Sequence, residues 1–155
     1  MAATPELPET LRGLLDGTDL AAKAGETFLL TTISEEGWPH LALLSVGEVY
    51  APGPREIRLA LWPDSTTTGN LTRNGRASLT LVSGGAAYHV RLTATRGPDL
   101  VLRPVPLAGF AATVCAVRAD AVGYAELTSG VRFRLRDPGP VLERWAATVA
   151  ALRTS

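Results

Sequence analysis

Cysteine and lysine are nearly missing from this sequence, whose 155 residues include one cysteine, Cys115, and one lysine, Lys23. A single cysteine excludes an intramolecular disulfide framework, and it excludes a metal site built on a cluster of cysteines. Cys115 lies in the apolar run 111–117, where a free cysteine is usually a small buried side chain. We therefore expect Cys115 to belong to the core rather than to act as a reactive thiol.

Net charge and long apolar runs are lacking as well. The 15 basic residues balance the 15 acidic ones, so no overall field attracts the protein to nucleic acid or to an anionic membrane. No apolar stretch reaches the roughly 18 residues of a membrane span, and the opening MAATPELPET lacks the basic and apolar regions of a signal peptide. We expect a cytoplasmic protein with one globular domain over residues 1–155, without nucleic-acid or membrane partners.

Common catalytic motifs are absent too. The sequence contains no GxxxxGK, GxGxxG, GxSxG, HExxH or CxxC, so the usual nucleotide, hydrolase and zinc signatures all fail. His40 and His89 lie on predicted strands, where a lone histidine is more often a surface residue than a catalyst. Glu35 and Glu36 are neighbours in a predicted turn, so their carboxylates diverge into solvent. The sequence therefore assigns no catalytic residue and no metal ligand.

Strand-like patterns dominate the chain. The segment 130–136 alternates between apolar residues, expected to face inward, and three arginines, expected to face outward. Turns at 34–37 and 84–85 predict hairpins, and the proline-containing segment 50–54 is expected to be a connector. The expected strands are 28–33, 38–46, 56–62, 76–83, 86–96, 111–118 and 130–136.

Three short helices are expected around these strands. The first covers about 5–17 and carries one leucine stripe, and the last covers about 138–153. Between them, a run of hydroxyl residues after Asp64 predicts a capped helix that ends at Gly75. Hairpins without a regular βαβ alternation predict a mainly β (α+β) fold, a small antiparallel barrel over about 27–136 with peripheral short helices.

Three stretches carry a shared pattern. EGWPHLALLS (36–45) is a Gly-x-Pro turn followed by an apolar strand, and STTTGNLTRNGRASL (65–79) is a short helix with Ser, Asn-Leu and Asn at fixed spacing before a strand. HVRL (89–92) is similar to a Gln-Val-Arg segment on a later strand. In this order they resemble the pyridoxamine 5′-phosphate oxidase-like family of FMN-binding proteins, whose fold is a split β-barrel.

The resemblance implies an FMN bound at the interface of a homodimer. In that family a strand contacts the isoalloxazine ring, and the phosphate lies at a helix start, where free N–H groups and the helix dipole favour an anion. The implied positions are Leu43, Leu44 and Ser45 for the ring, Ser65, Thr66 and Thr67 for the phosphate, His89 in place of the family's glutamine, and Arg91 as a cation from another strand. Arg73 and Arg76 are weaker alternatives to Arg91, because they lie at the far end of the helix, where the dipole is negative.

Each of these positions also has a structural alternative. The leucines can be core residues, the hydroxyl run can serve only as a helix cap, and His89 can lie on a solvated rim. The oxidase itself carries an arginine on the second strand and Ser-Arg-Lys at the helix start, where this chain has Ala42, Thr66 and Thr67. Each missing cation removes charge-assisted hydrogen bonds worth roughly 1.5–3 kcal/mol.

Two functions follow from the resemblance and these departures. The first is an FMN-binding, oxidoreductase-like flavoprotein that acts on an unidentified small molecule. Vitamin B6 oxidation is not expected, because the substrate-phosphate arginines of the oxidase have no match in this sequence. The second is a non-enzymatic dimeric relative, which binds flavin or a related cofactor weakly or not at all. A deazaflavin or haem in the same cleft is a further alternative to FMN.

Overall fold

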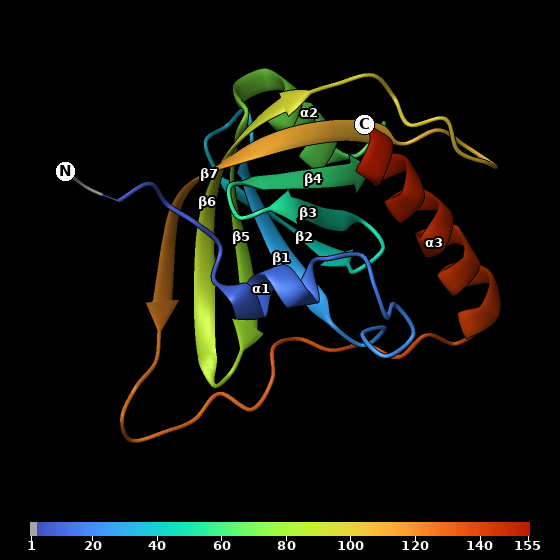
Figure 1. Cartoon of the computed structure of the whole chain (residues 1–155). Coiled ribbons are helices and arrows are strands. Elements are labelled where there is room, and N and C mark those ends of the chain that lie inside the picture. The colour runs from blue at the N-terminus through green and yellow to red at the C-terminus, as the bar shows by residue number, and fades with distance from the viewer. Residues whose placement is uncertain (1–2) are drawn as a thin grey trace.

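The computed structural model of the chain describes residues 3–155 as seven strands and three helices (Figure 1). Their bounds are α1 Glu9–Leu14, β1 Thr27–Ile33, β2 Pro39–Ser45, β3 Val49–Gly53, β4 Glu56–Leu61, α2 Thr66–Asn74, β5 Arg76–Ser83, β6 Ala86–Arg96, β7 Ala108–Asp120 and α3 Pro138–Thr154. The strands expected at 76–83 and 86–96 have these bounds, and four of the other expected strands agree to within a few residues.

All seven strands belong to one antiparallel sheet in the order β2-β1-β5-β6-β7-β4-β3. The two end strands, β2 and β3, do not pair with each other, so the curled sheet is an open half-barrel rather than a closed one. The predicted mainly β (α+β) fold, an antiparallel split barrel with short helices, is confirmed.

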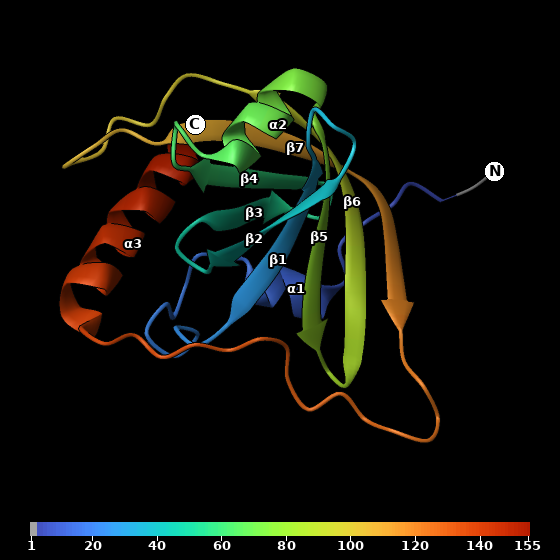
Figure 2. The same cartoon turned by 180° about the vertical axis from the view of Figure 1, so that it is seen from behind.

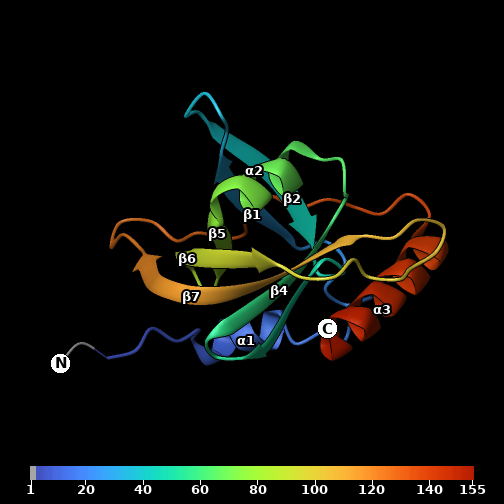
Figure 3. The ribbon, with the colours of Figure 1, turned by 90° about the horizontal axis from the view of Figure 1, so that it is seen from above.

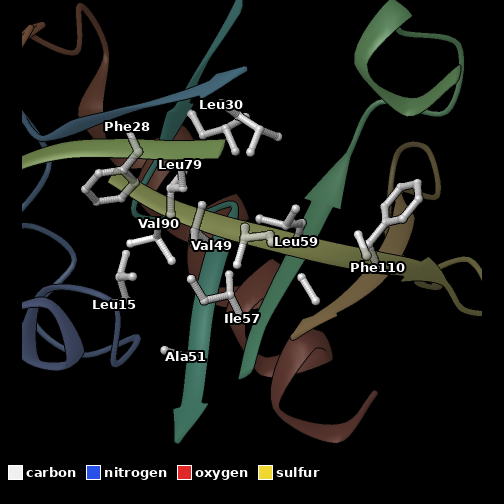
Figure 4. Packing of buried hydrophobic residues seen from close by; sticks show 14 of the residues in the cluster. Leu15, Phe28, Leu30, Val49, Ala51, Ile57, Leu59, Leu79, Val90 and Phe110 are labelled. Carbon is white, nitrogen blue, oxygen red and sulfur yellow. The ribbon is translucent and has the colours of Figure 1, made fainter. Parts of the chain in front are cut away.

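The core fills the concave side of this sheet (Figure 4). Side chains alternate along each strand, as the pleat requires. On β4, for example, Ile57 and Leu59 are fully buried, and they meet Leu79 of β5 and Val90 of β6 in one apolar cluster. The two-residue period that predicts these strands therefore also selects the residues of the core.

Two helices cover parts of this core. The leucine stripe of the first helix is buried at Leu11 and Leu15, and α3 buries Trp145 and Leu152. Figure 3 shows the ribbons of α1 and α3 beside the strands. Within residues 3–155, no helix is long and apolar enough to span a membrane.

The remaining helix, α2, is capped at its C-terminal end by a residue that must be glycine. Gly75 has a φ of +69°, and its N–H donates to the carbonyl of Leu71 at 2.8 Å. A Cβ at this position would lie 2.8 Å from the carbonyl oxygen of Ala94 on β6, so a side chain would strain the backbone and collide with the sheet. This residue fixes how α2 passes into β5.

Two of the strand predictions are wrong. The segment 130–136 is not a strand: only Arg132 makes an isolated bridge, to Glu26, and Phe133 stacks on Trp145 of α3 with ring centroids 6.4 Å apart. Of its alternating apolar side chains, Val131 and Phe133 stay 52% and 40% exposed, and Leu135 packs against the edge of the core cluster. The expected connector 50–54 contributes instead to the end strand β3, in which Val49 pairs with Leu59 of β4. The strand tolerates Pro52 because the pairing is irregular between Tyr50 and Gly53.

The prediction for Cys115 is also wrong, because its side chain is exposed on the convex face. The β6·β7 register shifts where Arg91 pairs with Ala116 and Leu92 pairs with Val114, which leaves Cys115 as the extra residue of a bulge. Its Sγ lies 3.2 Å from the hydroxyl of Thr93. The alternation of β7 already turns the thiol outward, because Ala112 and Val114 are buried while Thr113 and Cys115 are exposed. In an apolar run this alternation cannot be read from composition.

Candidate functional site

In the described part of the chain, no helix covers the convex face of β1, β5 and β6, which faces the viewer in Figure 2. In the sheet register Leu43 of β2 pairs with Leu29, Leu29 with Thr80, and Thr80 with His89 of β6. These side chains form one row across four strands of this outer face. Because neighbouring strands lie about 4.8 Å apart, the row spans roughly 14 Å from an apolar to a polar end.

The apolar end of the outer face is unusually exposed. Leu41 and Leu43 project from β2 with 56% and 53% of their surface open, and Ile33 at the end of β1 is 40% open. We call these three residues the apolar strip. A group of large apolar side chains on one exposed sheet face is typical of a surface that binds a ligand or another protein.

Two arginines lie next to the apolar strip. Thr31 pairs with Ser78 and Ser78 with Arg91, while Arg76 stands opposite Thr93 on the neighbouring rung. All five residues line one hollow, which we call the arginine hollow. Neither Arg76 nor Arg91 forms an ion pair with any residue in 3–155. Two unneutralised guanidinium groups beside hydroxyl groups are suited to bind an anion such as phosphate.

His89 lies on the same face, between two polar neighbours. Its Nδ1 is 3.2 Å from the hydroxyl of Thr80, and its Nε2 is 3.1 Å from the carboxylate of Asp120. Arg118 donates to the same carboxylate at 3.0 Å. Asp120 therefore contacts both His89 and Arg118, and it forms no ion pair with Arg76 or Arg91 in the described chain.

The start of α2 forms a closed cap. The hydroxyl of Ser65 accepts from the N–H of Thr68 at 3.1 Å and lies 3.0 Å from the hydroxyl of Thr68, which donates to the carbonyl of Trp62 at 2.7 Å. Thr66 is exposed, whereas Thr67 is buried with 3% of its surface open. Ser65 therefore acts as a helix cap, and of the three predicted phosphate ligands Thr67 faces the interior.

Ser65 and Thr66 line a groove that also carries charged side chains. We call it the helix-start groove, and its charged residues are Glu35, Glu36 and Asp64 with Arg73 and Arg96. Three carboxylates thus surround two guanidinium groups. A phosphate at this helix start would meet more negative than positive side chains, which opposes the attraction of the helix dipole.

The predicted ring contacts are also separated by the structure. Leu44 pairs with Phe28 on the concave side and is 3% exposed, so it is a core residue. Ser45 is 2% exposed, and its hydroxyl donates to the carboxylate of Glu48 at 2.6 Å. Of the three predicted ring contacts, Leu43 alone presents its side chain to the outer face.

The structure thus brings Leu43, His89 and Arg91 together on the outer face and places Ser65 and Thr66 in the separate helix-start groove. Sequence reasoning ranked Arg76 below Arg91 and missed Arg96. A local signal pointed to Arg76, because the two-residue turn at 84–85 fixes the hairpin register and places Arg76 on the same face as Arg91. No comparable signal places Arg96, whose position depends on how α2 packs.

No family model matches the sequence. A related protein does match it. YclD, an uncharacterized protein of Bacillus subtilis (strain 168), is 41% identical over 147 residues, which cover 95% of this chain and 96% of YclD. The chain belongs to the YclD family.

The fold of this YclD-family chain recurs among solved structures. A putative pyridoxamine 5′-phosphate oxidase of Lactobacillus delbrueckii has a TM-score of 0.58 and 17% identity, over 74% of this chain and 95% of that one. An F420 reductase has a TM-score of 0.55 and 13% identity, over 72% and 98% of the two chains. The resemblance to split barrels of the pyridoxamine-phosphate-oxidase type is confirmed at the level of the fold.

Proposed function

We propose that this YclD-family protein is a homodimeric, oxidoreductase-like flavoprotein that binds FMN on the outer face of the sheet and acts on an unidentified small molecule in the cytoplasm. The observation that carries the proposal is that the apolar strip lies directly beside the arginine hollow, whose two arginines form no ion pair in the part of the chain that the structure describes. A flavin nucleotide has the matching chemistry, a flat apolar ring system joined to a phosphate by a polar chain.

The outer-face residues fit such a ligand in three parts. The apolar strip would contact the ring, His89 would contribute a polar edge, and Arg91 with Arg76 would hold the phosphate. A charge-assisted hydrogen bond contributes roughly 1.5–3 kcal/mol, so two arginines would replace part of what the three cations missing at Ala42, Thr66 and Thr67 supply in the oxidase. The bound flavin would supply the redox chemistry, and the protein would orient it and exclude water.

The fold supports a ligand of this class, since one protein of the same fold is by name an F420 reductase and another a putative pyridoxamine 5′-phosphate oxidase. The apolar strip supports the homodimer. A second copy laid on the outer face would cover Leu41 and Leu43 and enclose the ring between two chains. We expect an interface in the obligate size class, at least about 2,000 Å².

Arg91 and Ser65 line separate hollows, so a phosphate that touches both is expected to take them from two copies. Thr66→Lys tests this arrangement, because Thr66 is exposed in the helix-start groove whereas Thr67 is buried. With the phosphate in the arginine hollow of one chain alone, this substitution leaves FMN affinity unchanged. If the partner's helix start also contributes, FMN binding tightens about tenfold, which corresponds to about 1.4 kcal/mol.

Cofactor titration tests the proposed function itself. Purified protein should be yellow or become so with added FMN, and its flavin absorbance should rise in proportion to protein until saturation. FMN should bind more tightly than riboflavin, because riboflavin lacks the phosphate. F420 is the third ligand to test, since its reductase shares the fold.

The non-enzymatic dimeric relative remains the second candidate, favoured by Ala42 and by the closed cap at Ser65, which leave the family's phosphate position without a cation. It replaces the first if FMN, riboflavin and F420 all bind more weakly than about 1 mM, that is, by less than about 4 kcal/mol.

A further inference from the structure

A second cavity lies away from the outer face, between α3, the end of β4 and the loop 102–107. Its volume is about 110 Å³. The loop and α3 are far apart in the sequence but lie on the same side of the barrel (Figure 1). Residues of both line the cavity. Trp62 and Trp145 form aromatic walls, and Leu102 and Leu107 add aliphatic surface.

One acidic side chain, Glu48, lines this apolar cavity. Its Oε1 accepts two hydrogen bonds from Ser45, from the N–H at 3.1 Å and from the hydroxyl at 2.6 Å. Its Oε2 has no hydrogen-bond partner among residues 3–155. Every fully buried side-chain polar atom in that range does have a partner, so Oε2 is not fully buried. Oε2 therefore keeps some accessible surface, and because Glu48 lines the cavity, we infer that this oxygen lies at the cavity wall.

The surroundings of Glu48 disfavour its negative charge. Burial raises the pKa of this carboxyl group, whereas the bonds from Ser45 and the charge of Arg144 act in the opposite direction. Arg144 and Arg103 also line the cavity, yet neither forms an ion pair with Glu48 in the described chain. Both arginines are exposed, so their guanidinium groups are solvated. A carboxylate oxygen thus lacks a donor in a largely apolar site, and such a site favours a ligand that brings one.

We propose that this cavity binds a primary alkylamine, or the alkylamine end of a larger molecule, with its ammonium group on Oε2 of Glu48. An ammonium group brings both a positive charge and hydrogen-bond donors, and Trp62 and Trp145 can add cation–π attraction. An apolar cavity of about 150 Å³ holds benzene, so this smaller one suits an alkyl chain of about four carbons. The site shares no residue with the outer face, so this proposal does not depend on whether the protein binds a flavin.

Three probes with one alkyl chain and different head groups test this proposal: butylamine, butanol and butyrate. The three tryptophans report binding through their indole N–H signals in NMR spectra of ¹⁵N-labelled protein. Trp62 and Trp145 line the cavity, whereas Trp38 is 74% exposed in the β1–β2 turn and serves as the internal control. The titrations use protein without added flavin.

We expect butylamine to shift the signals of Trp62 and Trp145, but not Trp38, and to bind at least tenfold more tightly than butanol or butyrate at pH 8. Glu48→Gln keeps an oxygen for the bonds from Ser45 and removes the charge, so it should abolish this preference. Ala147→Leu, which fills the cavity from α3, should weaken all three probes. In the wild type, binding should weaken as the pH falls through the raised pKa of Glu48.

Three results would each overturn the proposal: tighter binding of butyrate, which would assign the site to Arg103 and Arg144; equal shifts of Trp38; or an amine preference that survives Glu48→Gln. Absence of any saturable shift at millimolar probe, in protein that is folded, would overturn it as well. None of these results bears on FMN binding, which is measured on the outer face.

Discussion

Leu43→Ala should weaken the proposed dimer by a predictable amount. Leu43 is 53% exposed in the single chain, so a partner on the outer face would bury about half of its surface anew. Complete burial of a leucine side chain contributes about 1.5–3 kcal/mol, and half of it therefore about 1 kcal/mol. In a two-fold dimer each substitution occurs twice, so the loss is about 2 kcal/mol and the dissociation constant should rise about thirtyfold.

Sedimentation velocity over a dilution series to nanomolar protein measures this dissociation constant. Val101→Ala is the matched control, because Val101 is 95% exposed on the loop after β6 and does not belong to the outer face. We expect this control to dissociate as the wild type does. A wild-type monomer at micromolar concentration, or equal effects of the two substitutions, would refute the assignment of the interface to the apolar strip.

Three further predictions concern packing, reactivity and pH. Gly47→Ala should lower the free energy of unfolding by about 1–3 kcal/mol in urea denaturation, because its Cβ would lie 2.0 Å from Cγ of Trp145, whereas Gly139→Ala, in open space, should not. Cys115 should react with Ellman's reagent more slowly as the dimer fraction rises, and a rate independent of protein concentration would place the interface elsewhere. Glu48→Gln should stabilise the protein at pH 8 and not at pH 4. The pKa of Glu48 is raised in the folded protein, so the stabilising, protonated form is lost as the pH rises. A difference in unfolding free energy between variant and wild type that is the same at both pH values would contradict this.

Local patterns were sufficient to predict most of the fold. Two-residue turns and alternating side chains determine the β5–β6 hairpin, and a hydroxyl cap followed by Gly75 determines α2. The error at 130–136 has a physical reason. Alternation of apolar and polar side chains is compatible with any extended segment, but the segment becomes a strand only if it pairs with a free sheet edge. Phe133 has its partner in Trp145, which lies on a helix that sequence periodicity does not place in space.

The candidate site was predictable only in part, because its residues come together through sheet register. Register places Leu43, His89 and Arg91 on one face, and it also assigns Leu44 to the core. The hydroxyl run was ambiguous, since a helix cap and a phosphate site use the same groups. The cavity at Glu48 left no motif at all, because it depends on how α3 packs against the barrel.

The most direct test of the proposed function is the effect of Arg91→Ala on FMN affinity relative to riboflavin affinity. Arg91 lies on the outer face and forms no ion pair within residues 3–155, whereas Arg12→Ala on α1 is a matched control that removes an exposed arginine elsewhere. If the arginine hollow holds the phosphate, Arg91→Ala weakens FMN about tenfold or more and leaves riboflavin nearly unchanged, while Arg12→Ala changes neither. Equal losses for FMN and riboflavin, or no loss for either, would show that the phosphate does not bind in the arginine hollow.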